Sequence, residues 1–291
     1  MRHPTAELIT VTYSGDLATL YYHALSLAKF WTGEKRWKIV VEDQSIYQRV
    51  IQWINDRIVP EMQGWEVSIV TGPVLVSNDG WHRQQVLKLW AASESTADYS
   101  IIIDSKNFLI KNLNISDFFD GEKLKVGIFS ERNRQPNIPD PTHIEACRIL
   151  GVAEATEIHP ITPFVWRNSL VRGLLDKLNS VNYNILIQPH IKASEAALYW
   201  VYAQNKEAWV DANEIWAFGQ YGGVTKNTRL TPDQLREQFR QADQNNAYMI
   251  TMHRFHITPE NADILSEYLR TKGLVNDQQI AFFRDTFKII S

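Results

Sequence analysis

Cysteine is almost absent from this chain of 291 residues, in which Cys147 is the single thiol. One cysteine cannot form a disulfide within the chain, and it cannot supply the several thiolates of a cysteine-based metal site. The sequence therefore argues against a disulfide framework and against a cysteine-held metal, and it favours a reducing compartment.

Long hydrophobic runs are also missing. No apolar segment approaches the roughly 20 residues that a membrane-spanning helix needs, and residues 1–7 lack the apolar core of a signal peptide. We therefore expect a soluble, cytoplasmic protein without a membrane span.

Neither sign of charge dominates, and two common nucleotide-binding motifs do not occur. The 30 basic and 33 acidic residues leave a formal net charge of -3, so nucleic acid is not an expected partner. The G-x-G-x-x-G fingerprint and the G-x-x-x-x-G-K-[ST] loop are both absent, which argues against dinucleotide oxidoreductases and P-loop enzymes. Tryptophan, in contrast, occurs ten times. Its rings can hold sugars, although filling a core is their more frequent use.

Strand and helix patterns alternate along the first half of the chain. Between Asp16 and Trp31 apolar residues recur at three- and four-residue spacing, with Asp16 in the position of an N-cap. Such a series predicts an α/β fold with a mixed, mostly parallel sheet flanked by helices. The expected strands are 8–13, 37–42, 65–70 and 99–103, and the expected helices are 16–31, 45–57 and 81–94.

The pattern becomes less regular after Asp104. Thr231 and Thr258, each followed by proline, predict the N-caps of two helices. Three prolines predict a surface loop at 135–141, which is either a simple connector or a lid over bound substrate. Further expected elements are strands at 125–130 and 247–253 and helices at 145–150, 167–178 and 194–204.

The most informative stretch runs from Gly80 to Ile110. A helix with a polar face precedes an apolar strand, whose three consecutive isoleucines predict a central parallel strand covered on both faces. Asp104 follows that strand. Open α/β sheets bind ligands beyond the carboxyl ends of their strands, so we expect a nucleotide or metal site at Asp104.

The run from Trp81 to Leu89, followed by Ile-Ile-Asp104-Ser-Lys-Asn107, resembles nucleotide-diphospho-sugar glycosyltransferases of the GT-A fold. It is most similar to a bacterial branch that carries Asp-Ser/Ala-Lys-Asn at the strand end in place of the usual Asp-x-Asp. The likeness touches most of the chain, although only this central block is specific. Its other parts are Ile9 to Asp16, Ser194 to Tyr199 and Met252 to Arg254.

This resemblance implies a GT-A-like, Rossmann-related domain over 1–291, with a nucleotide-binding half at 1–130 and an acceptor-side half at 131–291. It also implies a glycosyltransferase of polysaccharide biosynthesis or other glycoconjugate assembly. The partners would be a nucleotide-diphosphate sugar donor and a glycan or glycoconjugate acceptor, and an inverting outcome is favoured. The donor sugar, its base and the acceptor cannot be read from the sequence.

The resemblance also implies where the donor lies. The ends of the first two strands would lie near its base and ribose, which makes donor-binding candidates of Tyr13, Ser14, Asp16 and Asp43. In the alternative, Asp16 and Ser45 only cap helices.

The usual Asp-x-Asp pair holds a divalent cation, and here the sequence departs from that pattern. Asp104 keeps the first carboxylate, but Lys106 occupies the second acidic position. An ammonium repels a metal and can itself pair with phosphate oxygens. A Mn or Mg ion on Asp104 and a metal-independent reaction both stay open, with Lys106 as a donor-binding candidate. In the alternative, Lys106 is a solvated turn lysine and Asp104 caps the strand end.

The preceding helix adds three donor-binding candidates, Arg83, Gln84 and Lys88. Gln84 and Lys88 lie four residues apart and share a helix face, so both can point toward Asp104. Arg83 lies in the first turn, where the helix dipole also favours phosphate. The alternative is a solvated charged face.

The remaining candidates come from the second half. His253 and Arg254 follow an expected strand and suit a diphosphate, although a histidine there is often only structural. The resemblance implies that Glu195, at a helix start, removes the acceptor proton, so Glu195 and Asp104 are the catalytic candidates. Acidic residues at helix starts commonly serve the helix dipole alone. Because the second aspartate is lost, a rival class is a non-catalytic nucleotide- or carbohydrate-binding protein on the same fold.

Overall fold

The structure is a computed structural model. It describes residues 4–42, 47–73, 80–120, 123–124, 126–127, 141–155, 162–180, 193–206, 215–216, 230–253 and 257–290. Four features expected from the sequence lie outside these residues: Asp43, Ser45, Arg254 and the proline-rich loop before Pro141.

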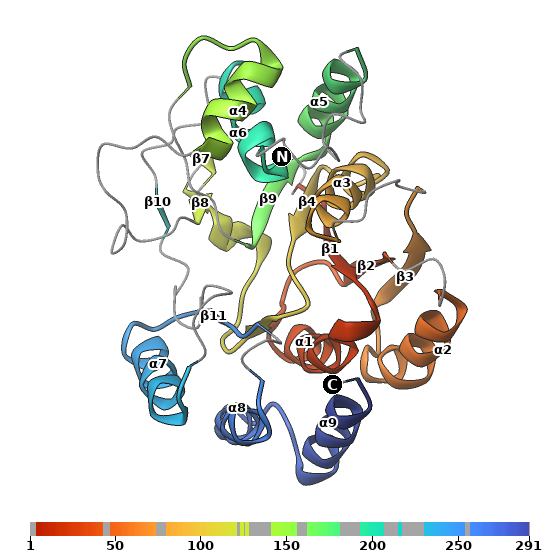
Figure 1. Ribbon diagram of the computed structural model, residues 1–291, viewed down its shortest axis with the longest axis vertical. Coiled ribbons are helices and arrows are strands. Elements are labelled where there is room, and N and C mark those ends of the chain that lie inside the picture. The colour runs from red at the N-terminus through yellow and green to blue at the C-terminus, as the bar shows by residue number, and fades with distance from the viewer. Residues whose placement is uncertain are drawn as a thin grey trace.

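A five-stranded sheet forms the centre of the molecule, with the order β3-β2-β1-β4-β9 (Figure 1). Neighbouring strands from β3 to β4 are parallel, and β9 runs antiparallel to β4. The predicted class, a mixed and mostly parallel sheet flanked by helices, is confirmed. The strands are β1 (Ala6–Thr12), β2 (Arg36–Val41), β3 (Glu66–Thr71), β4 (Tyr99–Ile102) and β9 (Phe164–Arg167).

The isoleucine-rich strand β4 is buried inside the sheet, as its composition predicts. The strand that pairs with β4 on its other side, β9, corrects one detail of the prediction. We expected a central parallel strand, but β4 is parallel to β1 only and pairs with β9 in the antiparallel sense. An apolar run reports burial on both faces, and it carries no information about the direction of the neighbouring strand.

Helices cover both faces of the sheet (Figure 1). On one face, His23 of α1 contacts Thr10 of β1. On the other, Lys38 of β2 donates to the carbonyl oxygen of Ala91 in α3. The helices of the first two thirds of the chain are α1 (Leu17–Phe30), α2 (Tyr47–Arg57), α3 (Gly80–Ser93), α4 (Pro141–Leu150), α5 (Asn168–Ser180) and α6 (Glu195–Gln204).

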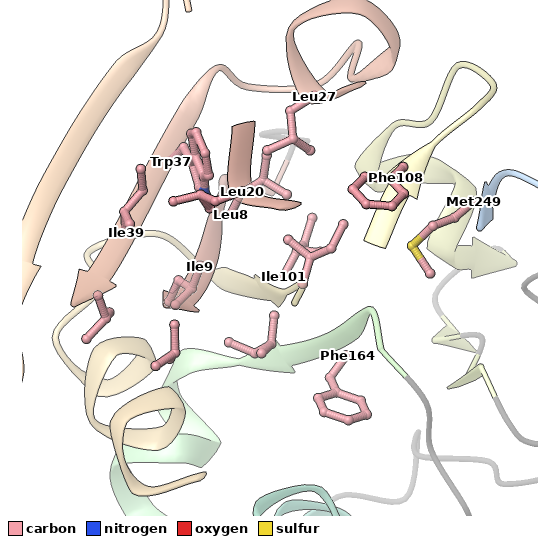
Figure 2. Packing of buried hydrophobic residues seen from close by; sticks show 14 of the residues in the cluster. Leu8, Ile9, Leu20, Leu27, Trp37, Ile39, Ile101, Phe108, Phe164 and Met249 are labelled. Carbon is pink, nitrogen blue, oxygen red and sulfur yellow. The ribbon is translucent and has the colours of Figure 1, made fainter. Parts of the chain in front are cut away.

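The core between α1 and the sheet is apolar and closely packed. Leu8 and Trp37 are register partners on β1 and β2, and Leu20 of α1 lies against them (Figure 2). All three side chains are fully buried. Burying a side chain of this size contributes about 1.5–3 kcal/mol, so these contacts hold α1 and the two strands in one unit.

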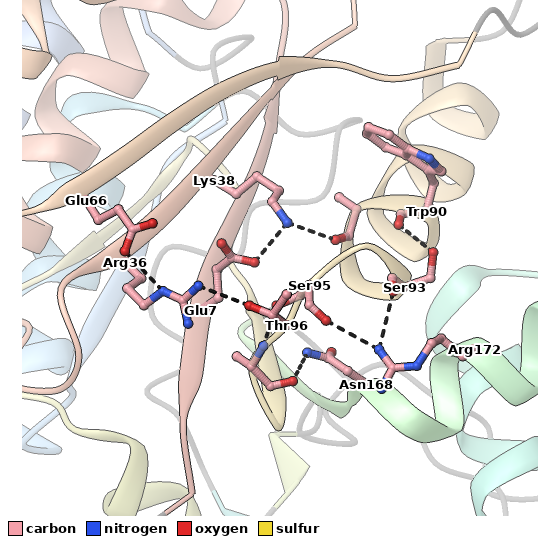
Figure 3. A network of polar contacts seen from close by, with 12 residues as sticks. Glu7, Arg36, Lys38, Glu66, Trp90, Ser93, Ser95, Thr96, Asn168 and Arg172 are labelled. Carbon is pink, nitrogen blue, oxygen red and sulfur yellow. Dashed lines mark hydrogen bonds and ion pairs between the residues drawn. The ribbon is translucent and has the colours of Figure 1, made fainter.

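Charged groups tie the sheet to α3 and α5 near the amino ends of the strands (Figure 3). Lys38 Nζ lies 2.9 Å from Glu7 Oε2 on the neighbouring strand. Arg172 of α5 donates from Nη1 to the carbonyl oxygens of Ser93 and Ser95, both at 3.3 Å. These contacts fix where α3 ends relative to the sheet.

The last part of the chain adds α7 (Pro232–Gln244), α8 (Pro259–Thr271) and α9 (Asp277–Ile290). Both predicted N-caps are confirmed, because Thr231 accepts from the Gln234 amide and Thr258 from the Asn261 amide. Short strands complete the fold. They are β5 (Asn107–Leu109), β6 (Phe119–Asp120), β7 (Lys123–Leu124), β8 (Val126–Gly127), β10 (Ile215–Trp216) and β11 (Met249–Thr251), and β11 pairs antiparallel with β5.

Three expected elements have different bounds. Within the described residues, the strand expected at 125–130 is only β8, and the strand expected at 247–253 is only β11. The helix expected at 145–150 begins earlier, at Pro141, because proline suits the first position of a helix, where its missing N–H leaves no bond unmade.

Most tryptophans belong to the core. Trp31, Trp37, Trp166 and Trp200 are buried, and three others are half-buried and pack against the core. Among the tryptophans whose side chains the structure describes, Trp81 is exposed, with 42% of its surface accessible to solvent. The helices in the described part of the chain are all too short or too polar to cross a lipid bilayer.

Candidate functional site

The carboxyl edge of the sheet brings several predicted residues together. Because β1, β2 and β4 run parallel, the segments that follow them leave the sheet at one edge. Tyr13 and Ser14 follow β1, Glu42 follows β2, and Asp104 follows β4 after Ile103. The carboxyl edge expected from the sequence is thus present, with Asp104 on it.

Four charged side chains meet at this edge. Lys88 Nζ lies 2.9 Å from Asp104 Oδ1 and 3.1 Å from Glu195 Oε1. Lys106 Nζ lies 3.0 Å from Asp104 Oδ2. The side chains of Lys88 and Glu195 are only 8% and 7% exposed, whereas that of Lys106 is 29% exposed. Lys88, Asp104, Lys106 and Glu195 form what we call the edge cluster.

The electrostatics of the edge cluster keep Asp104 and Lys88 ionised. Burial by itself raises the pKa of Asp104, but Lys106 and Lys88 outweigh it and hold that pKa well below its ordinary value. Burial by itself lowers the pKa of Lys88, and Asp104 and Glu195 reverse this and raise it above its ordinary value. Two carboxylates and two ammonium groups balance, so the cluster can form in a largely dry place.

A divalent metal does not fit this arrangement. Each oxygen of Asp104 already contacts an ammonium group, at 2.9 and 3.0 Å. A cation on that carboxylate would lie close to two positive charges. Within the part of the chain that the structure describes, no three His, Cys, Asp or Glu side chains form a group that could hold a metal ion.

The helix α3 supplies a residue that sequence reasoning missed. Gln85 is buried, and its Oε1 accepts from the Glu195 backbone amide at 2.8 Å. We expected Gln84 to accompany Lys88, and Gln84 is half-buried on the same helix. Residues three apart on a helix are neighbours just as residues four apart are. The spacing of Gln85 and Lys88 was therefore an equally good signal, and only packing against α6 distinguishes them.

The position of Glu195 is set by its helix start. Ser194 is the N-cap of α6 and its hydroxyl accepts from the Ala197 amide at 3.1 Å. Glu195 is the first residue of the helix, where the dipole favours its negative charge. The carboxylate is also bound to Lys88 of α3, so it does more than serve the dipole.

Asp16 and Arg83 have partners that the sequence did not predict. Asp16 occupies the N-cap position of α1, but its side chain makes no capping hydrogen bond there. Its Oδ2 instead accepts from the Ser105 hydroxyl at 3.1 Å, beside Asp104. Arg83 donates from Nε and Nη2 to Glu42 Oε1, at 2.9 and 2.8 Å. A part of the Arg83 charge is thus committed to a buried carboxylate.

The backbone at His253 lies close in space to the edge cluster. His253 follows Met252, whose amide donates to the carbonyl oxygen of Lys106 at 2.9 Å. This contact extends the pairing of β11 with β5, in which Thr251 is opposite Asn107. The structure therefore brings the chain at His253 next to the Asp104–Lys106 turn, across about half of the sequence, and Arg254 lies outside the described residues.

His23, which sequence reasoning also missed, is buried next to the turn that runs from Asp104 to Asn107. His23 Nδ1 donates to the Asn107 carbonyl oxygen at 2.5 Å, and Nε2 lies 3.3 Å from Thr10 Oγ1. Burial lowers the pKa of His23 to about 4, so the ring is neutral at pH 7. A neutral ring with its proton on Nδ1 can accept from Thr10 at Nε2, which satisfies both nitrogens.

Comparisons with known proteins place the chain in a family but do not give its activity. One solved structure with a similar shape is the glycosyltransferase GlyE of Streptococcus pneumoniae TIGR4, at a TM-score of 0.44 and 9% sequence identity. That match covers 99% of this chain and 64% of GlyE, so the chain spans less than two thirds of the length of GlyE. A likeness this weak does not indicate a function for the chain. No curated protein matches. The family described as "Family of unknown function (DUF6492)" matches residues 12–229, well over half of the chain. The protein belongs to the DUF6492 family.

Proposed function

We propose that this protein is a GT-A-like glycosyltransferase, which moves a sugar from a nucleotide-diphosphate donor to a glycan or other glycoconjugate acceptor. The observation that carries the proposal is the edge cluster, with the partly exposed Lys106 at the carboxyl end of β4. Ligands of open α/β sheets bind at this edge. A departing diphosphate needs positive charge, and a lysine ammonium suits phosphate oxygens.

In this proposal the charge on the diphosphate comes from side chains. An ammonium has three N–H donors, so Lys106 can contact Asp104 and a phosphate oxygen at once. Asp104 and Lys88 would hold Lys106 in place, and His253 and Arg254 would add to the anion site. Tyr13, Ser14, Asp16 and Asp43 would lie along the base and ribose.

Glu195 is the proposed base for the acceptor hydroxyl. It belongs to the half of the chain assigned to the acceptor, and its carboxylate joins the edge cluster through Lys88. A base must come within hydrogen-bond reach of the proton that it removes, so the acceptor would bind over the start of α6. This role suits the favoured inverting outcome, in which a single displacement uses one base on the acceptor hydroxyl.

One observation favours a second function, a non-catalytic nucleotide- or carbohydrate-binding protein. The edge cluster is balanced in charge, and the Glu195 side chain is only 7% exposed and paired with Lys88. A carboxylate paired in this way suits a structural role as well as a catalytic one.

A screen of nucleotide sugars separates the two functions. We expect one donor class to raise the melting temperature in the presence of a chelator, and then to release nucleoside diphosphate over time. Binding without turnover, with or without Mn or Mg, would support the binding protein. If no nucleotide sugar shifts the melting temperature under either condition, the glycosyltransferase and the nucleotide-binding form of the second function are both wrong.

Replacing Lys106 by alanine tests the source of the positive charge. We expect donor binding to weaken by about 1.5–3 kcal/mol, the scale of a charge-assisted hydrogen bond. Calorimetry with the donor in a chelator measures this change. Lys272→Ala is the matched control, because Lys272 also pairs with a carboxylate, that of Asp243 at 2.5 Å. Complete loss of wild-type binding in the chelator, restored by Mn or Mg, would contradict the role of Lys106.

A further inference from the structure

The turn that carries Asp104 and Lys106 is closed at both ends by one residue, Asn107. The Asn107 amide donates to the Asp104 carbonyl oxygen at 2.9 Å. In return, the Asp104 amide donates to Asn107 Oδ1 at 3.0 Å. These reciprocal bonds leave Ser105 and Lys106 as the two turn residues between β4 and β5. Asn107 therefore sets the conformation of the backbone that bears both charged side chains.

The same side chain reaches two distant segments. Asn107 Oδ1 also accepts from the Thr162 hydroxyl at 3.1 Å. Its Nδ2 donates to Thr251 Oγ1 at 2.6 Å. Thr162 precedes β9, and Thr251 ends β11, two residues before His253. One buried amide thus connects the turn to segments 55 and 144 residues away.

The chemistry of this position requires an amide of this length. Both bonds to Oδ1 need an acceptor with two lone pairs, and the bond from Nδ2 needs a donor on the same group. Aspartate would offer no N–H and would add a negative charge beside Asp104. Alanine would leave the Asp104 amide and the Thr162 hydroxyl without this acceptor in a partly buried place, which is costly. His23 completes the site by donating to the Asn107 carbonyl oxygen.

From these contacts we infer that Asn107 is a positioning residue, which holds Asp104 and Lys106 in the geometry of the edge cluster and keeps the His253 segment beside them. It acts through Asp104 and Lys106 and does not itself contact substrate. This inference rests on the proposed function only for its kinetic consequence, since the geometry of Lys106 can be measured without any donor.

The test is the reactivity of the Lys106 amine. Brief labelling with acetic anhydride, followed by mass spectrometry of peptides, gives the Lys106 rate relative to Lys272 in the same sample. Lys272 is a suitable reference, because its side chain is 24% exposed and is paired with Asp243. We expect Asn107→Ala to raise this ratio about threefold to tenfold, because the turn no longer holds Lys106 on Asp104.

Two milder variants keep the test decisive if Asn107→Ala does not fold. Thr251→Val and Thr162→Val each remove one contact to Asn107, and each should raise the ratio by a smaller factor. The control is Asn245→Ala, which removes an exposed asparagine whose Nδ2 donates to the Gln241 carbonyl oxygen and should leave the ratio unchanged. An unchanged ratio in folded Asn107→Ala, or in both threonine variants, would overturn the inference.

The kinetic arm separates this inference from the proposed function. If the wild-type protein transfers sugar, Thr251→Val should lower kcat more than it raises the donor KM, in protein that thermal melts show to be folded at the assay temperature. If the wild-type protein turns over no donor, the proposed function fails, and the labelling ratios still decide the role of Asn107. Equal kinetics in Thr251→Val and wild type would contradict positioning even where the proposed function holds.

Discussion

Replacing Asp104 by alanine is expected to abolish sugar transfer while the protein stays folded. Asp104 is the contact that joins Lys106 to Lys88, at 3.0 and 2.9 Å, so its loss would release Lys106 from the place where the diphosphate should bind. Removing one preorganised electrostatic contact of this kind costs about 10²–10³-fold in rate. Lys88 would keep Glu195 as its counter-ion, and we therefore expect the fold to survive.

Turnover assays and thermal melts of the same sample measure this prediction. Asp104→Asn is the isosteric variant and should lose transfer as well, because an amide carries no charge to hold two ammonium groups. Asp243→Ala is the control, since Asp243 is a lysine-paired carboxylate on a remote helix. A soluble Asp104→Ala protein with wild-type turnover would show that the site is elsewhere. An unfolded one would support the alternative in which Asp104 only caps its strand.

Replacing Glu195 by glutamine has the second large expected effect. If Glu195 is the base on the acceptor hydroxyl, turnover should fall by about 10²–10⁴-fold, the usual contribution of a general base. Donor affinity should be nearly unchanged, because in the proposed function the diphosphate would be held by Lys106 and the His253 segment. Turnover assays and calorimetry with the nucleoside diphosphate measure the two effects separately.

The variant His253→Ala is the matched comparison. It should weaken binding of the nucleoside diphosphate itself, whereas Glu195→Gln should not. An exchange of the two phenotypes, or a fully active Glu195→Gln protein, would show that the roles are wrong. A fall in melting temperature with preserved turnover would assign Glu195 to the second role that its geometry allows, that of counter-ion to the buried Lys88.

A reaction without a metal would also follow from the edge cluster. In the sequence, Lys106 stands where the usual Asp-x-Asp pattern has its second aspartate, and this left open whether the reaction needs a metal. The structure adds that Lys88 occupies the other oxygen of Asp104, which the sequence could only suggest from the shared face of the helix. A single carboxylate between two ammonium groups is a poor ligand for a cation.

The sequence by itself determined the elements and the edge at which they place polar residues. Strand and helix periods, N-caps such as Thr231 and Thr258, and the position of Asp104 after an apolar strand depend on neighbours a few residues away. Local pattern therefore predicts them. The direction of Lys88 toward Asp104 was predicted for the same reason, because residues on one helix face are set by the helix period.

Only the tertiary structure decided which side chains share a contact. Lys88 and Glu195 are 107 residues apart, and Asn107 and Thr251 are 144 apart. No local period links such pairs, and their meeting depends on how α3 packs against α6 and how β11 pairs with β5. The choice of Gln85 over Gln84, and of Glu42 as the partner of Arg83, was decided in the same way. Neighbouring positions on a helix are equivalent until another element packs against one of them.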